Sequence, residues 1–352
     1  MKILIFSLAL IAHLSWGQNY PKPEEGDFVL KNFKFSQGEV LPSLTQHYMT
    51  LGKPLKNSYG KVTNAVLIMH GSTGNGGGFL SERFAGNLFG PGQLLDATKY
   101  YLILPDAIGH GKSSKPSDGL RMKFPAYTYD DMVKAQYQLV TEHLGVNHLR
   151  LVMGTSMGGM FTWVWGYTYP DFMDALLPLA SLPVEIGGRN RMLRKMIIDG
   201  IESDPEWKNG EYVSQPPGLT TAINSLLVMV SSPLQWQKAA PTREASEKFL
   251  QEQIVRYRKT LDANDVIYVF DASRFYNPDP HLSQIKAPLL AINSADDQVN
   301  PPELGIMEVE IRKIPKGKYV LLPITDETRG HGTHSIPKIW GSYLSELLKM
   351  SE

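Results

Sequence analysis

The chain has 352 residues, of which 42% are hydrophobic, and its 35 basic residues balance 35 acidic ones. This length and composition fit one large domain that carries an insertion. The balanced charge offers no field for nucleic acid or an anionic membrane, and the absence of cysteine excludes disulfides, metal thiolates and thiol nucleophiles. We therefore expect a small or neutral molecule as the partner, and no nucleic acid.

Residues 1–17 have the pattern of a cleaved signal peptide. Lys2 supplies a positive charge, residues 3–14 form an almost unbroken apolar run, and Ser15 and Gly17 put small residues at the −3 and −1 positions of a cleavage site. The run is shorter than the roughly 20 apolar residues that span a bilayer, so a permanent membrane anchor is the weaker alternative. We expect a mature chain that begins near Gln18, has no stable membrane anchor, and is secreted or periplasmic.

Short apolar runs recur along the rest of the chain and predict strands. Residues 33–51 have the alternation of antiparallel strands at a sheet edge, after a polar lead-in over residues 19–31. The later runs are apolar throughout and end in glycine-rich or polar turns, as buried parallel strands do. These runs are 65–69, 100–104, 149–153, 288–292 and 318–322.

Helical patterns lie between these strands. Residues 132–144 have apolar residues at helical spacing after a Thr128 cap and an acidic first turn, and residues 338–348 predict a C-terminal helix. Strands that alternate with helices predict an α/β domain whose mostly parallel central sheet has helices on both faces. Residues 185–281 break this alternation and contain helical pieces such as 245–261. We interpret them as an inserted helical cap between the two parts of the core, 18–184 and 282–352.

The strongest chemical signal is the sequence Gly154-Thr155-Ser156-Met157-Gly158, which follows an apolar run and precedes a helical pattern from Met160. It matches the G-x-S-x-G turn, in which small flanking residues allow a sharp bend from strand to helix that exposes the serine hydroxyl. The helix N-terminus behind the bend favours negative charge. The pattern predicts Ser156 as the nucleophile of an α/β-hydrolase fold.

A serine needs a base and an acid, which follow it in chain order in this fold. Asp296 and Asp297 lie in the turn after the strand at 288–292, and Asp297 is favoured because the following residues fit an Asp-x-x-x-Pro spacing, with Asp296 as the alternate. His331 follows the last strand and a glycine, and is favoured as the base over His334. A metal site at these two histidines lacks a third ligand.

Acyl transfer also requires two backbone N–H groups for the oxyanion. Met157 follows the nucleophile and provides one, and Ser72, in the turn after the first parallel strand, is the expected second donor. This chemistry uses side chains and backbone alone, so we expect no metal and no organic cofactor.

These motifs resemble the homoserine O-acetyltransferase (MetX-like) family of α/β-hydrolases over almost all of the mature chain. The matching segments are 127–133, 154–160, 169–171, 204–207, 210–212, 218–219, 262–264, 297–302 and 330–331. The resemblance implies Ser156, Asp297 and His331 as nucleophile, acid and base. It also implies a possible homodimer, with caps in contact.

Two departures from the family bear on the substrate. Ile223 stands where the family has an arginine for the substrate carboxylate, and Gly332 stands where it has an aspartate for the substrate amine. Both changes remove charge complementarity to an amino acid, and acetyl-CoA is not expected outside the cytoplasm. We therefore expect a serine hydrolase that cleaves an ester-type bond in a small-molecule acyl substrate through an acyl-enzyme. An acyltransferase is the alternative, and a non-catalytic binding module is a third and weaker interpretation.

Overall fold

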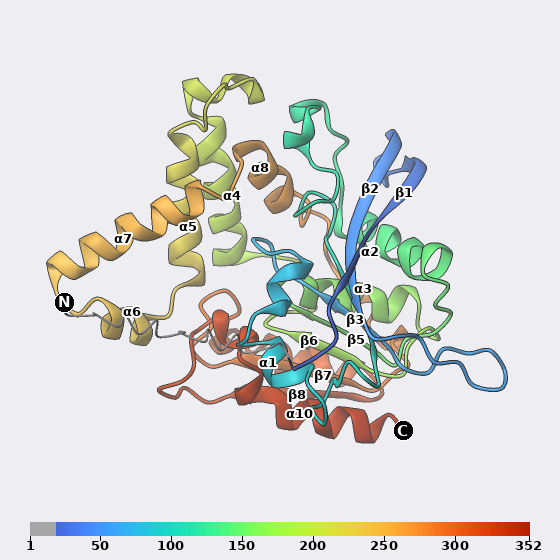
Figure 1. The fold of residues 1–352 in the computed structure, drawn as a ribbon. Coiled ribbons are helices and arrows are strands. Elements are labelled where there is room, and N and C mark those ends of the chain that lie inside the picture. The colour runs from blue at the N-terminus through green and yellow to red at the C-terminus, as the bar shows by residue number, and fades with distance from the viewer. Residues whose placement is uncertain (1–18) are drawn as a thin grey trace, which may run out of the picture.

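The computed structural model describes residues 19–352, so the predicted signal peptide lies outside the described residues. An eight-stranded sheet occupies the centre of this part of the chain, in the order β1-β2-β4-β3-β5-β6-β7-β8 (Figure 1). The strands are β1 (Glu24–Lys34), β2 (Val40–Leu51), β3 (Ala65–Met69), β4 (Tyr101–Pro105), β5 (Leu151–Thr155), β6 (Leu176–Leu179), β7 (Leu289–Ser294) and β8 (Gly317–Leu322). The β1–β2 and β2–β4 pairs are antiparallel and the remaining pairs are parallel, which confirms the predicted mostly parallel sheet.

The central strands form where the sequence is apolar throughout. Every residue of β3, β4, β5, β6 and β7 is buried, as expected for parallel strands that are covered on both faces. The predicted runs coincide with β3, β4, β5, β7 and β8 to within two residues at each end.

Two strands differ from the sequence prediction. The residues interpreted as a polar lead-in belong mostly to β1, which starts at Glu24 and pairs along its length with β2. Most of its side chains are exposed at the sheet edge, so the strand carries no apolar run. Strand β6 was not predicted, because it has only four residues and Pro178 interrupts its pattern.

Two helical layers cover the sheet, as predicted. They comprise α1 (Ala85–Leu88), α2 (Tyr129–Gln138), α3 (Met157–Thr168), α9 (Ile306–Glu310) and α10 (Pro337–Met350). Leu67 and Ile103 belong to the core that includes side chains of α2 and α3, whereas Val66 and Leu102 belong to the opposite core with α1 and α10. Successive strand residues therefore bury their side chains on opposite faces of the sheet.

The predicted cap of the first long helix is confirmed. Thr128 has extended backbone angles and its hydroxyl accepts a hydrogen bond from the Asp131 N–H, while the Asp131 carboxylate accepts one from the Thr128 N–H. This reciprocal pair satisfies two N–H groups that the helix leaves free. Helix α2 begins at Tyr129, directly after the predicted cap, and residues 139–143 continue it as a π-helical turn.

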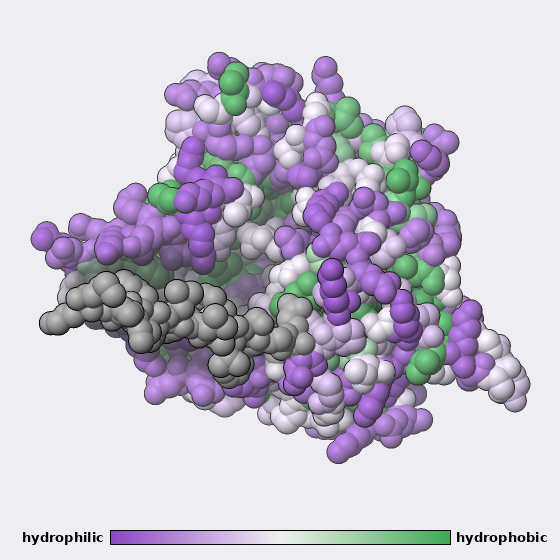
Figure 2. Space-filling view, in the orientation of Figure 1, coloured by the Kyte–Doolittle hydropathy of each residue, from purple (hydrophilic) through white to green (hydrophobic). Residues whose placement is uncertain are grey.

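Residues 185–281 contain five further α-helices, which pack outside the sheet (Figure 1). They are α4 (Gly188–Glu202), α5 (Gly218–Val230), α6 (Pro233–Ala239), α7 (Arg243–Arg258) and α8 (Ala263–Asp271). Helices α4, α5 and α8 share a separate apolar core. Helix α7 has a hydrophilic outer face (Figure 2), with Ile254 as its buried residue. Within residues 19–352, no helix combines the length and apolar character needed to cross a membrane.

The junction of β5 with α3 is packed backbone against backbone. A Cβ atom added to Gly158 would lie 2.0 Å from the Met69 carbonyl oxygen of β3, and one added to Gly154 would lie 2.1 Å from the Gly158 carbonyl oxygen. These distances leave no room for any side chain. Glycine at both positions lets the start of α3 touch the ends of β3 and β5.

We predict that Gly158→Ala lowers the free energy of unfolding by about 3 kcal/mol, because the added methyl group meets backbone atoms that cannot move aside. Gly78→Ala is the matched control, since nothing lies within 4 Å of the atom it adds. Urea unfolding followed by circular dichroism measures both. A Gly158→Ala protein as stable as the wild type would contradict this account of the junction.

Candidate active site

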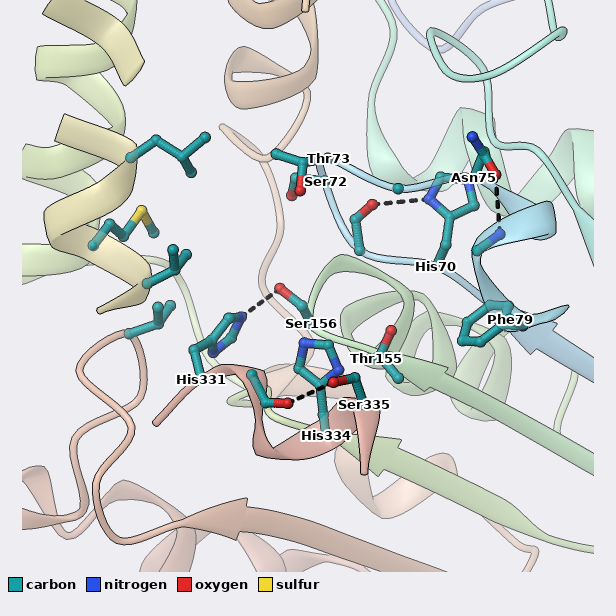
Figure 3. A pocket seen from close by; sticks show the side chains of 18 of the residues that line it. His70, Ser72, Thr73, Asn75, Phe79, Thr155, Ser156, His331, His334 and Ser335 are labelled. Atoms are coloured by element: carbon teal, nitrogen blue, oxygen red, sulfur yellow. Dashed lines mark hydrogen bonds between the residues drawn. The ribbon is translucent and has the colours of Figure 1, made fainter. Parts of the chain in front are cut away.

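Ser156 occupies the turn between β5 and α3 in a strained conformation. Its φ is 57° and its ψ −114°, a left-handed region that non-glycine residues rarely adopt. The Ser156 N–H donates to the Leu179 carbonyl oxygen of β6 at 2.9 Å, and the Ser156 carbonyl accepts from the Met160 N–H at 2.9 Å. Such strain costs on the order of 1–3 kcal/mol and persists only when the surroundings impose it. Its effect is to direct the hydroxyl away from the sheet (Figure 3).

The hydroxyl of Ser156 is hydrogen-bonded to His331, which follows β8. The distance from Ser156 Oγ to His331 Nε2 is 2.7 Å (Figure 3). On its other side, His331 Nδ1 lies 2.9 and 3.1 Å from the two carboxylate oxygens of Asp297. Since a carboxylate can only accept, Nδ1 carries the proton and Nε2 is free to accept the serine hydroxyl proton. The structure thus brings together the three residues favoured from the sequence.

Asp297 lies in the turn after β7 and is almost completely buried. Burial alone would raise its pKa, but the His331 charge and hydrogen bonds from His331, Asn300 and Val299 outweigh it, so the pKa lies below its usual value. The bonds to the carboxylate are 2.8 Å from the Val299 N–H and 3.0 Å from Asn300 Nδ2. Asp297 is therefore ionised at neutral pH and holds His331 in one tautomer.

The alternate acid, Asp296, has a different set of partners. Its carboxylate accepts a hydrogen bond from the Ser294 hydroxyl at 2.5 Å and one from the Gly330 N–H at 2.8 Å. The second bond ties the turn after β7 to the residue that precedes His331. Asp296 thus fixes the position of the loop, whereas Asp297 contacts the imidazole.

The alternate base, His334, lies near His331 and forms no hydrogen bond with the serine hydroxyl. Its ring centre is 5.4 Å from that of His331, with the two rings nearly perpendicular, and its Nδ1 atom is buried without a hydrogen-bond partner among the described residues. Burial, followed by the neighbouring His331 charge, lowers the pKa of His334 to about 3. His334 is therefore a neutral side chain of the pocket wall, facing Ser156 (Figure 3).

The predicted oxyanion donors belong to the two segments that adjoin the serine, the start of α3 and the turn after β3. Met157 is the first residue of α3, and the first N–H groups of a helix have no partner within it. The turn after β3 passes directly over the serine, since a Cβ atom added to Gly71 would lie 3.2 Å from Ser156 Cβ. The Ser72 N–H belongs to the peptide that follows Gly71, so it is part of the turn that passes over the serine.

Two histidines that the sequence analysis did not single out fix this turn. His70 Nδ1 donates to the Gly71 carbonyl oxygen at 2.8 Å while its Nε2 accepts from the Ala107 N–H at 3.0 Å. His110 Nε2 lies 3.1 Å from the Ser72 carbonyl oxygen. Burial lowers the pKa of His70 to about 4 and that of His110 to about 3. The position of His70 directly before a glycine at a strand end was the available signal.

Ser156, His331 and His334 line a pocket of about 560 Å³. The loops after β3, β5 and β8 form one side, and helices α4, α5, α7 and α8 form the other. The helices contribute Arg194, Leu226, Met229, Tyr257 and Phe270. Neither Asp nor Glu is among the described residues that line it. The volume is typical of small-molecule sites.

The two positions that depart from the family lie in different surroundings. Gly332 lines the pocket. Ile223 is buried in the apolar core of α4, α5 and α8 and is not among the lining residues. The apolar side chain of Ile223 thus packs against the other side chains of this core.

The sheet, the turn at Ser156 and the loops after β7 and β8 define the class of α/β-hydrolases, and the sequence profile of the alpha/beta hydrolase fold family matches residues 64–325. A probable acyltransferase of Methanothermobacter thermautotrophicus is 30% identical over 313 residues, covering 88% of this chain and 93% of the relative. A homoserine O-acetyltransferase of Haemophilus influenzae is 31% identical over 274 residues, covering 68% and 75%. The chain belongs to the homoserine O-acetyltransferase-like family of α/β-hydrolases.

A solved structure with the same fold is that of an acetylester hydrolase from Corynebacterium glutamicum. It matches with a TM-score of 0.79 over 93% of this chain and 96% of that chain, at 21% sequence identity. The fold is thus shared by proteins described as transferases and as ester hydrolases, so the fold alone does not decide between the two activities.

The buried histidines make stability depend on pH. Because the folded-state pKa of His334 is lowered to about 3, the unfolded chain binds a proton at this residue below about pH 6.5 that the folded chain does not. Stability is therefore lost as the pH falls from about 6.5, and His334→Phe is predicted to reduce the loss between about pH 7 and pH 5 by on the order of 2 kcal/mol.

Urea unfolding at the two pH values measures this effect. His281→Phe is the control, because His281 is exposed, and we expect it to lose as much stability on acidification as the wild type. An equal loss in His334→Phe and the wild type would show that position 334 does not contribute.

Proposed function

We propose that this chain is a serine hydrolase that cleaves ester-type bonds of small molecules through an acyl-enzyme on Ser156. The observation that carries the proposal is the unbroken hydrogen-bond chain from Ser156 through His331 to Asp297 at the wall of a pocket of about 560 Å³. A hydroxyl 2.7 Å from an imidazole nitrogen that can accept its proton has the geometry of an activated nucleophile.

The proposed reaction has two halves. His331 Nε2 takes the Ser156 proton as Oγ attacks the substrate carbonyl carbon, and the imidazolium then gives that proton to the departing alcohol, which leaves an acyl-serine. In the second half, His331 takes a proton from water, the hydroxide attacks the acyl-serine, and the proton returns to Ser156 Oγ as the acid departs. Atoms and charge balance in each half without a further reactant.

The remaining residues stabilise the charges that form during the reaction. Asp297, ionised through its lowered pKa, stabilises the imidazolium that forms on His331. The Met157 and Ser72 N–H groups are proposed to hold the oxyanion. His70 positions the second of these, because the Gly71 carbonyl that it holds at 2.8 Å and the Ser72 N–H belong to one rigid peptide plane. With the carbonyl fixed, the N–H points to the opposite side.

Acyl transfer to an amino acid is the second candidate, and the named relatives favour it. A probable acyltransferase and a homoserine O-acetyltransferase are 30% and 31% identical to this chain. Against it, the pocket offers no carboxylate to the amine of an amino acid, since Gly332 replaces the expected aspartate and none of the described lining residues is acidic. A buried amine without a partner is unfavourable. Water is therefore proposed as the acceptor.

Ser156→Ala is predicted to lower kcat/KM on a panel of short-chain p-nitrophenyl esters by at least about 10³-fold, because it removes the hydroxyl that is hydrogen-bonded to His331. His331→Ala is expected to have a similar effect, whereas His334→Ala is expected to change it less than about tenfold, since the Ser156 hydroxyl is hydrogen-bonded to His331 and not to His334. Circular dichroism shows whether each variant is folded. Full activity in folded Ser156→Ala would overturn the proposal.

The choice of acceptor is tested with acetyl-CoA and homoserine, serine or water, with products separated by mass spectrometry. We expect acetate without O-acetyl product, because the pocket lacks a group for the amine. An O-acetyl amino acid formed faster than acetate would establish the transferase.

We also propose that residues 1–17 direct export of the protein. A mature chain from native cells that still begins at Met1 would contradict export.

A further inference from the structure

Arg194 is a buried cation in the wall of the pocket that contains Ser156. It lies on α4, the residue is only 2% exposed, and it lines the pocket. Its Nε donates to Asn190 Oδ1 at 2.9 Å and its Nη1 to the Ser273 hydroxyl at 3.2 Å, and the guanidinium carbon is 5.6 Å from the centre of the Phe270 ring. These contacts hold the guanidinium in one orientation.

The charge of Arg194 has no counter-ion in the protein. Among residues 19–352, no carboxylate lies within 4.0 Å of its nitrogen atoms, and both hydrogen-bond partners are neutral. No hydrogen bond joins Nη2 to a described residue. Arginine is almost never fully buried unless it is paired, because removing its charge from water is costly. An unpaired guanidinium in a pocket wall therefore indicates a ligand that supplies the negative charge.

The other lining residues add positive charge to the pocket and no negative charge. Arg83 also lines it and is exposed, and none of the described lining residues is acidic. Asp297 is outside the lining and is paired with His331. The pocket thus carries positive charge without compensation, which favours an anion and disfavours an amine.

We propose that Arg194 is the carboxylate-binding subsite of this enzyme and that its substrates are esters that carry a carboxylate in addition to the bond cleaved. This inference rests on the proposed function and names its substrate class. The guanidinium fork matches a carboxylate with two parallel hydrogen bonds. Asn190 and Ser273 hold Nε and Nη1, so the fork is already oriented before the substrate enters.

Matched ester pairs test the subsite. In the acyl pair, p-nitrophenyl monoglutarate and p-nitrophenyl pentanoate differ only by a terminal carboxylate in place of a methyl group. In the alcohol pair, m-carboxyphenyl butanoate and m-methylphenyl butanoate differ in the same way. The quantity measured is the ratio of kcat/KM for the anionic ester to that for the neutral one.

The wild type is expected to prefer the anionic ester of at least one pair by about tenfold to 100-fold, the effect of one or two charge-assisted hydrogen bonds. Arg194→Met is expected to abolish the preference, and Arg194→Lys to keep part of it, because lysine retains the charge and loses the fork. The ratio compares two substrates on one preparation, so a partly inactive variant does not distort it.

Lys195→Met is the matched control, because it removes one positive charge from the neighbouring, exposed position of the same helix. Its ratio should equal that of the wild type. Should Arg194→Met fail to fold, Asn190→Ala replaces it. This variant frees Nε of the guanidinium and is expected to reduce the ratio.

The outcomes separate the two proposals. A wild type that hydrolyses the neutral esters but shows no anionic preference in either pair overturns the carboxylate subsite and leaves the hydrolase intact. An Arg194→Met ratio equal to that of the wild type also overturns it, since the preference then arises elsewhere. A folded wild type that cleaves none of the four esters, with Ser156 unreactive, overturns the proposed function itself.

Discussion

The site depends on a contact between backbones. Gly154 and Gly158 let the first turn of α3 lie against the ends of β3 and β5, with no space for a Cβ atom at either position. That contact forces the residue between them into a left-handed conformation, and Ser156 has a φ of 57°. In a regular helix or strand, the serine hydroxyl would lie among the side chains of neighbouring residues in that element. Here the hydroxyl stands clear of the sheet and meets an imidazole that comes from a different strand.

The partners of Ser156 are held by a second set of contacts that does not involve the serine. Asp297 follows β7 and His331 follows β8. These strands are paired in parallel, so both loops begin at the C-terminal end of the sheet's parallel strands. The Asp296 carboxylate joins the two loops through the Gly330 N–H at 2.8 Å. The two neighbouring acids therefore have different roles: Asp296 fixes the position of the loop, and Asp297 fixes the tautomer of His331. His70 does for the turn after β3 what Asp296 does for the last loop.

Much of this arrangement could be predicted from the sequence, because burial on both faces leaves a clear apolar run. Strand β3 was predicted at its observed ends, and Ser156 was found because a tight strand-to-helix bend demands small residues at fixed spacing. Asp297 was favoured over Asp296 on its spacing to Pro301 alone, since adjacent residues in a turn point in different directions that only the backbone path determines. Arg194 gave no signal at all. A single arginine on an amphipathic helix has the same pattern whether it faces solvent or a pocket.

The central claim is that Ser156 is activated by His331, and covalent trapping tests it most directly. The folded protein is incubated with a fluorophosphonate probe, and the adduct is located by peptide mass spectrometry. The account predicts one adduct, on Ser156, formed much more slowly in His331→Ala and absent from Ser156→Ala. A folded wild type that remains unlabelled, or that is labelled at another residue, would contradict it.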